Sequence, residues 1–199
     1  MILKSYIAEK NIELFQKYES VLIYGENDGI KTDLRNLLKK DKDEKTEIIN
    51  LFQEEIIKNN DSLYNHIFNN SLFSSNKIIF IHEATDKIFN LILECIDKPR
   101  SETKVFIFSD ILDKKSKLRN HYDKQNNLAS VACYKDNERT LMIYINTLLK
   151  DIKGITPEII NLIMTNSSLD RKVISSEIEK IKTFASNNIL KKIEIMKLL

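Results

Sequence analysis

The sequence predicts a mixed α/β fold in which a parallel sheet is flanked by helices and followed by a small all-helical region. In the first part of the chain, short apolar runs rich in β-branched residues alternate with helical patterns, as they do in parallel sheets. After about residue 137 the strand-like runs stop, and only helical stripes of isoleucine and leucine continue. We therefore expect an α/β domain over 1–136 and a helical domain over 137–199.

Five strand-like runs are expected in the α/β domain, over 21–24, 47–52, 77–81, 104–108 and 128–134. The run that begins at Lys77 is continuously apolar after its first residue, which is typical of a strand buried on both faces. Thr85 is placed to cap the helix that follows this strand. In the helical domain Gly154 is expected in a turn, and Thr156-Pro157 predicts a helix start with a hydroxyl cap and proline at the first position.

Composition excludes several classes of protein. The 199 residues are 42% hydrophobic and 30% charged, which is enough to supply a buried core and argues against general disorder. With 31 basic and 29 acidic side chains the formal net charge is +2, so the chain is no polybasic coat for nucleic acid. A dinucleotide fingerprint needs three glycines within six residues, and the whole chain has three, so a Rossmann site is excluded.

The cysteines and the apolar runs indicate the compartment. Cys95 and Cys133 are far apart and neither belongs to a C-x-x-C pair, which predicts two buried thiols in a reduced intracellular protein. No apolar run approaches the ~20 residues that a membrane-spanning helix needs. The expected location is therefore cytoplasmic, with no membrane partner.

An incomplete phosphate-binding motif follows the first of the expected strands. The Walker A loop is G-x-x-x-x-G-K-[ST] between a strand and a helix. Gly25, Lys31 and Thr32 have the required spacing, but the second glycine, Gly29, is displaced by one position and Ile30 stands in its place. We expect the β-branched side chain of Ile30 to block the close approach of backbone to phosphate.

Two further observations argue against a working nucleotide site. Glu26 and Asp28 bring negative charge into the loop where an anion would bind. The strand 77–81 should end in an aspartate that holds Mg²⁺, but it is followed by His82-Glu83, and a neutral imidazole is a poor ligand for that cation. The same segment lacks the second histidine of the zinc-protease motif H-E-x-x-H, since Asp86 stands there.

The sequence therefore predicts a chain that is not itself an enzyme and that holds neither a cofactor nor a metal ion. The alternative is an active P-loop NTPase or small-molecule kinase that uses Gly25, Lys31 and Thr32.

A second candidate site precedes the strand 77–81. Leu72 and Phe73 are two large apolar residues among polar turn-forming residues. They are expected either to fold back over the sheet as part of the core or to project as a wedge into a pocket on a partner protein. Residue patterning alone favours the core.

A basic run lies between the last two expected strands. It contains Lys114, Lys115, Lys117, Arg119 and Lys124. Such a run is usually a solvated helix face, and the alternative is a patch that contacts the phosphates of nucleic acid.

Four features, in their order along the chain, resemble the delta subunit of bacterial DNA polymerase III, a clamp-loader subunit. They are the strand and loop at 21–26, the segment 71–74, the segment 112–119 and the run 131–134. The resemblance implies an AAA+-like fold with a degenerate nucleotide site, followed by a helical lid domain.

It also implies that Leu72 and Phe73 form a hydrophobic wedge that enters a pocket on the sliding clamp and helps to open its ring during DNA replication. The implied partners are the sliding clamp, other clamp-loader subunits and primer–template DNA within the assembled loader. Members of the family continue into a third, helical collar domain, so a chain that stops at Leu199 is expected to be a fragment or an unusually short relative.

Overall fold

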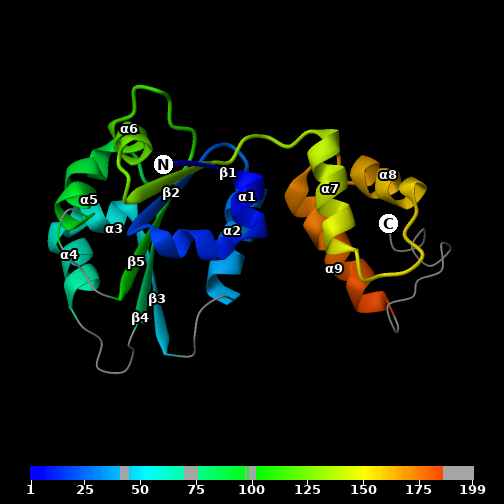
Figure 1. The fold of residues 1–199 in the computed structure, drawn as a ribbon, viewed down its shortest axis with the longest axis horizontal. Helices are drawn as coiled ribbons and strands as arrows, with labels where there is room; N and C mark the ends of the chain where they lie inside the picture. The colour runs from blue at the N-terminus through cyan, green and yellow to red at the C-terminus, as the bar shows by residue number, and fades with distance from the viewer. Residues whose placement is uncertain (41–44, 70–75, 97, 99–101, 186–199) are drawn as a thin grey trace. The chain divides into compact units, whose positions relative to one another are not determined.

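The structure is a computed structural model that describes residues 1–40, 45–69, 76–96, 98 and 102–185 (Figure 1). The chain divides into two compact units, Met1–Tyr134 and Lys135–Leu199. The first unit contains β1 (Ile2–Lys4), α1 (Ser5–Lys10), η1 (Ile12–Lys17), β2 (Ser20–Tyr24), α2 (Asp28–Lys40), β3 (Thr46–Phe52), α3 (Gln53–Lys58), α4 (Asn60–Phe68), β4 (Asn76–His82), η2 (Asp86–Ile88), α5 (Phe89–Ile96), β5 (Thr103–Ser109), α6 (Lys117–Lys124) and β6 (Leu128–Ala132). The second contains α7 (Glu138–Leu148), α8 (Pro157–Asn166) and α9 (Arg171–Phe184).

The first unit is built on a six-stranded sheet in the order β1-β6-β2-β5-β4-β3, in which every neighbouring pair is parallel. The prediction of a parallel sheet flanked by helices is confirmed. The prediction missed β1, which has three residues and pairs with β6 at the edge of the sheet. It also extended the last strand too far, because β6 ends at Ala132 and the carbonyl of Cys133 accepts from the amide of Asn27 in the loop after β2.

Both faces of the sheet are covered, which explains the continuous apolar runs. Helices α3 to α6 lie over one face, and α1, η1 and α2 lie over the other (Figure 1). In β4 the side chains of Ile79 and Ile81 join the first core and that of Phe80 joins the second. The ring centroid of Phe80 lies 5.9 Å from that of Phe106 and 5.8 Å from that of Phe108. Aromatic packing at this spacing adds to the free energy of simple apolar burial.

Two local expectations for the first unit are confirmed. Thr85 is the N-cap of η2, and its hydroxyl accepts from the amide of Lys87 at 3.3 Å. Cys95 and Cys133 are both buried, and neither forms a disulfide.

The second unit packs three helices around isoleucine and leucine side chains, among them Leu141, Ile163 and Ile178. Gly154 has φ 94° in the turn before α8, and α8 begins at Pro157 as predicted. Thr156 occupies the N-cap position, but its hydroxyl makes no capping bond and its buried Oγ1 has no hydrogen-bond partner. The apolar pattern expected over 189–199 lies outside the described residues.

A buried ion pair ties the start of α9 to the residues ahead of α7. The guanidinium of Arg171 lies 3.3 Å from the carboxylate of Asp136, and both side chains are almost fully buried. The ring of Tyr144 covers the same guanidinium, with its centroid 3.8 Å from Cζ. Within the described part of the chain, we find no helix that is long and apolar enough to cross a membrane.

Candidate functional site

The loop between β2 and α2, where the sequence predicts an incomplete phosphate site, is closed by its own polar groups. The side-chain oxygen of Asn27 accepts from the amide of Ile30 at 3.1 Å, and its Nδ2 donates to the carbonyl of Tyr134 at 3.1 Å. In a phosphate-binding loop the amides at the helix N-terminus point at the anion. Here the amide of Ile30 is already bound by Asn27, which acts as a cap for α2.

Gly25 serves the backbone rather than a ligand. Its φ is 133°, in a region that L side chains rarely adopt, and its amide donates to the carbonyl of Asp110 at 3.1 Å. A Cβ added to Gly25 would lie 2.3 Å from the carbonyl oxygen of Cys133. The close approach of the chain after β2 to the chain after β6 therefore requires glycine at this position.

The second glycine and its neighbour lie inside α2, which begins at Asp28. Gly29 is buried there, and Ile30 is 4% exposed and packs in the core beside Leu34. We expected the side chain of Ile30 to block a phosphate. This was wrong, because the side chain is buried in the core and does not face the loop. The amide that would meet an anion is instead occupied by Asn27.

Lys31 is held by two carboxylates and a carbonyl. Its Nζ lies 2.9 Å from Oδ1 of Asp28 and 3.0 Å from Oδ1 of Asp110, and it donates to the carbonyl of Ser109 at 3.2 Å. Burial alone would lower the pKa of Lys31, but the hydrogen bonds and charges of Asp28 and Asp110 outweigh it, so that the pKa is raised. Thr32 follows in the same helix, half-buried. A phosphate at this lysine would have to displace both carboxylates.

His82, the last residue of β4, has a structural role. The ring of His82 stacks on that of Phe108 with centroids 5.6 Å apart, and its Nε2 lies 3.0 Å from Oδ1 of Asn50. Burial, followed by the charges of Arg35 and Lys39, lowers the pKa of His82. A buried ring of lowered pKa stays neutral at neutral pH, and a neutral imidazole is a poor ligand for Mg²⁺.

Asp86, in the position of the second zinc-protease histidine, caps another helix. Its carboxylate accepts from the amides of Lys117 and Leu118 at 2.9 and 3.0 Å and from the hydroxyl of Ser116 at 2.7 Å. Across the described ranges, no group of three or more histidine, cysteine, aspartate or glutamate residues is arranged to hold a metal ion.

The basic run divides into exposed lysines and one structural arginine. The guanidinium of Arg119 donates to the carbonyl of Leu112 at 2.9 Å, and its Cζ lies 5.1 Å from the ring centroid of Tyr24. The other basic side chains of the run are exposed, namely Lys114, Lys115, Lys117 and Lys124. A surface that contacts phosphate would therefore consist of these lysines without Arg119.

Leu72 and Phe73 lie outside the described residues. The described elements on either side of them are α4, which ends at Phe68, and β4, which begins at Asn76. Because the strands are parallel, the first residues of β4 lie at the amino edge of the sheet. The loop that contains Gly25 lies at the opposite, carboxyl edge.

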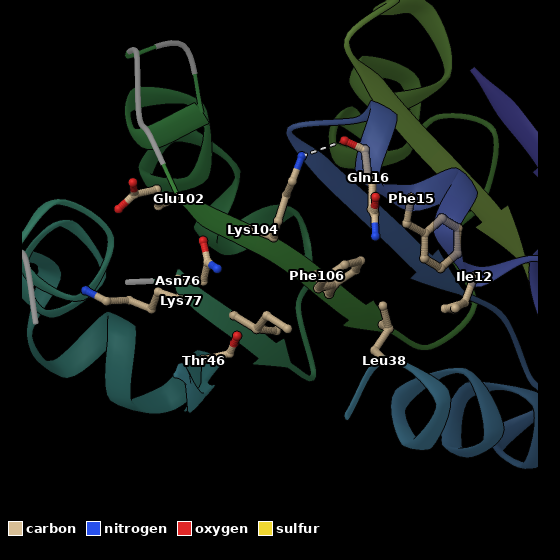
Figure 2. A pocket seen from close by; sticks show the side chains of 11 residues that line it. Ile12, Phe15, Gln16, Leu38, Thr46, Asn76, Lys77, Glu102, Lys104 and Phe106 are labelled. Atoms are coloured by element: carbon tan, nitrogen blue, oxygen red, sulfur yellow. Dashed lines mark hydrogen bonds between the residues drawn. The ribbon is translucent and has the colours of Figure 1, made fainter. Parts of the chain in front are cut away.

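An open pocket of about 400 Å³ lies at the amino edge, where β3, β4 and β5 begin (Figure 2). Its apolar lining includes Phe15 from η1, Leu38 from the end of α2, and Phe106 from β5. Glu102 and Lys104 supply charge at its rim, and Nζ of Lys104 donates to the carbonyl of Gln16 at 2.9 Å (Figure 2). None of the four residues of the predicted phosphate loop lines this pocket.

Comparisons with known proteins identify solved structures of similar fold. No protein-family model matches the sequence, and no curated protein matches it. Among solved structures, the DNA clamp loader delta protein of Bacillus subtilis superposes with a TM-score of 0.66 at 14% identity, over 98% of this chain and 62% of that one. The chain is similar in fold to a clamp-loader subunit.

Two further structures share this fold. C. elegans PCH-2 matches with a TM-score of 0.54 at 13% identity, over 98% of this chain and 63% of that one. A Walker-type ATPase of Pyrococcus abyssi matches with a TM-score of 0.50 at 13% identity, over 96% of this chain and 69% of that one. The predicted AAA+-like fold is thereby confirmed. The chain spans less than two thirds of the length of the delta protein that it resembles.

Sequence reasoning missed three residues that shape the two edges of the sheet. They are Asn27, which closes the start of α2, Asp110, which binds Lys31, and Lys77, whose ammonium binds the end of α4. An asparagine just before a helix and a lysine within an apolar strand are signals that a reader of the sequence can find. The partner of Lys31 has no such signal, because 79 positions separate it from Asp110.

Proposed function

We propose that the chain is a non-catalytic clamp-loader subunit that binds the sliding clamp and helps to open it during DNA replication. The fold supports this, since it matches that of a clamp loader delta protein over 98% of the chain. The observation that carries the non-catalytic part is the state of Lys31, whose ammonium is bound by Asp28 and Asp110. On this proposal, ATP is hydrolysed by other subunits of the loader.

The proposal assigns clamp binding to Leu72 and Phe73. Adjacent leucine and phenylalanine side chains in a polar segment are suited to fill an apolar pocket on a partner, where such anchors supply most of the binding free energy. On this proposal the clamp-binding pair precedes β4 in the chain, whereas the incomplete phosphate loop follows β2.

The test is the affinity of the full chain for immobilised sliding clamp from the same organism, with a Leu72→Ala, Phe73→Ala double variant. We expect the double variant to bind about 30-fold more weakly, since truncated anchors cost roughly 2 kcal/mol or more. Ile111→Ala is the matched control, because Ile111 is 71% exposed and follows β5 at the carboxyl edge. Equal affinities of the double variant and the parent chain would contradict the assignment.

The competing proposal is an active P-loop NTPase or small-molecule kinase. Lys31 is retained at the start of α2, and the fold is shared with a Walker-type ATPase. Calorimetry with Mg-ATP separates the two proposals. We expect no heat of binding, whereas micromolar binding that Lys31→Ala abolishes would establish the NTPase.

We further propose that other loader subunits and primer–template DNA are partners, and that DNA is contacted only within the assembled loader. Exposed lysines such as Lys114 and Lys117 supply the charge for phosphate contacts. Binding of a primer–template duplex by the isolated chain should be weak and should fall steeply with salt, because phosphate contacts release counterions. Tight binding that does not change with salt concentration would contradict this role for the lysines.

A further inference from the structure

Two basic side chains on α2 lie one helical turn apart and have no acidic partner among the described residues. Arg35 and Lys39 are four positions apart, so they share one face of the helix. Neither forms a hydrogen bond or an ion pair with another described residue. Because like charges at this spacing repel each other, the pair leaves positive charge on this face of α2 that the described residues do not neutralise.

Two other arginines of the described chain do have carboxylate partners. Nη1 of Arg171 lies 3.3 Å from Oδ2 of Asp136, and Nε of Arg119 lies 3.5 Å from Oδ2 of Asp123. Arg35 is half-buried, as Arg119 is. An arginine that is partly withdrawn from water usually recovers its lost hydration from an acceptor. Arg35 therefore has donors available for an anion that comes from outside the described residues.

Aromatic rings and a histidine lie beside these two cations. Nζ of Lys39 lies 5.9 Å from the ring centroid of Phe80, and that ring lies 6.4 Å from the ring of His82. The ring of Phe52, which is 43% exposed at the end of β3, lies 5.1 Å from the ring of His82. The cations on α2 and the ends of β3 and β4 thus meet on one face of the sheet.

The charges that act on His82 agree with this arrangement. Burial lowers the pKa of His82 most, and the positive charges of Arg35 and then Lys39 lower it further. The side chains that contact the ring from the neighbouring strands are uncharged, namely Asn50 on β3 and Phe108 on β5. His82 is therefore a natural reporter for any anion that binds between the two cations.

We propose that Arg35 and Lys39, beside the ring of His82, form a binding site for a phosphate group. A guanidinium presents paired donors that match two phosphate oxygens, and a lysine ammonium adds a point charge. This site lies further along α2 than the incomplete phosphate loop, whose Lys31 is already bound by carboxylates. It does not depend on the proposed function.

Two sources can supply the phosphate group, a free phosphate ester or the backbone of a nucleic-acid strand. In the second case the exposed ring of Phe52 offers a surface on which a base stacks. The chemistry at Arg35 and Lys39 is the same in both cases, so the experiment has one arm for each source.

The first arm is a pH titration of His82 by NMR in the full chain, in sodium phosphate and in sodium chloride of equal ionic strength. His82→Gln assigns the resonance, and the resonances of His66 and His121 serve as internal references. We expect phosphate to raise the pKa of His82 more than chloride does, because a bound anion favours the charged ring.

The double variant Arg35→Gln, Lys39→Gln tests which residues carry this response. In chloride it should raise the pKa of His82, since the two charges that lower that pKa are gone. The phosphate concentration for a half-maximal response should rise more than about tenfold, because hydrogen bonds to charged groups are lost. Arg139→Gln, Lys150→Gln removes the same charge from exposed positions in the second unit and should respond to phosphate as the parent chain does.

The second arm measures the binding of a fluorescent oligothymidylate to the same variants. Weaker binding by the Arg35 and Lys39 double variant than by the Arg139 and Lys150 control assigns the site to a nucleic-acid backbone. Equal binding, together with a response of His82 to phosphate, assigns it to a free phosphate ester.

Thermal unfolding shows whether the double variant retains the fold, and loss of the repulsion between the two cations should leave it at least as stable as the parent. If it is less stable, Lys39→Gln alone gives the same comparison, because Lys39 is exposed. A phosphate response that the double variant retains in full would overturn the assignment to these residues. Equal responses of His82 to phosphate and chloride, with equal oligothymidylate binding by the double variant and the control, would overturn the site.

Discussion

The two edges of the parallel sheet use their polar groups in different ways. At the carboxyl edge, Lys31 is paired with carboxylates and Asn27 binds the first turn of α2, so the groups that would meet a phosphate bind one another. At the amino edge, Lys77 binds the carbonyls at the end of α4, next to the segment proposed to contact the sliding clamp. The polar groups at the carboxyl edge thus bind one another, and Lys77 at the amino edge caps a helix.

This difference teaches that closure of a phosphate loop need not come from steric blocking. The backbone geometry of the loop is maintained by Gly25, and the lysine of the motif is still present. The donors that would bind an anion are occupied instead: the amide of Ile30 donates to Asn27, and the ammonium of Lys31 donates to Asp110. The loop therefore contributes to stability, and changes in it should alter folding more than clamp binding.

The largest effect on stability is expected for Gly25→Ala. The added methyl group would lie 2.3 Å from the carbonyl oxygen of Cys133, and the φ of 133° is strained for alanine. We expect a loss of roughly 3 kcal/mol in the free energy of unfolding, measured by urea denaturation.

Gly29→Ala is the control, because Gly29 lies in the first turn of α2 without a positive φ. It should be neutral or stabilise the protein by roughly 0.5 kcal/mol. A Gly25→Ala protein as stable as the parent would contradict the view that the close approach of Gly25 to Cys133 holds the loop at the carboxyl edge.

The strands were the most predictable part of the fold. In β2, β4 and β5 both faces are buried, so the sequence carries an unbroken apolar signal. β1 has only three residues and lacks enough pattern to be recognised, although it completes the sheet beside β6. Local capping was predictable in position, as Thr85 shows, but not always in bonding, as Thr156 shows.

For the candidate site, the sequence predicted only that the Walker A motif is incomplete. Spacing revealed that Gly29 is displaced and that acids enter the loop. The contacts that close the site join residues far apart in the chain, such as Lys31 to Asp110 and Asn27 to Tyr134. Such pairings depend on which strands become neighbours, and no local pattern encodes them.

A smaller effect on stability is expected for Asn27→Ala. The change removes the acceptor for the amide of Ile30 and the donor to the carbonyl of Tyr134. Loss of such a cap costs about 1–2 kcal/mol, measurable by urea denaturation. Asn27→Asp retains the acceptor for the amide of Ile30 but puts a carboxylate oxygen against the carbonyl of Tyr134, so it should recover only part of the stability that Asn27→Ala loses. Both variants should bind the sliding clamp like the parent chain, and a large loss of clamp affinity in either would link the two edges.

The smallest effect is expected for Asp86→Asn, which tests a second internal pairing at the carboxyl edge. Burial would raise the pKa of Asp86, but the hydrogen bonds from Leu118, Ser116 and Lys117 outweigh it and lower the pKa below its usual value. A carboxyl whose pKa is lower in the folded state stabilises the fold above its unfolded pKa, and this stabilisation is lost as the pH falls through the folded value.

Thermal unfolding followed from about pH 6 down to about pH 3 should therefore show a shallower loss of stability in Asp86→Asn than in the parent chain. Glu94→Gln, at an exposed acid on α5, is the control for the loss of one carboxylate elsewhere in the first unit. Parallel profiles of the Asp86 variant and the parent would mean that the carboxylate contributes no more to the folded state than to the unfolded one. The cap on α6 would then owe its stability to the hydroxyl of Ser116, which accepts from the amide of Arg119 at 3.2 Å.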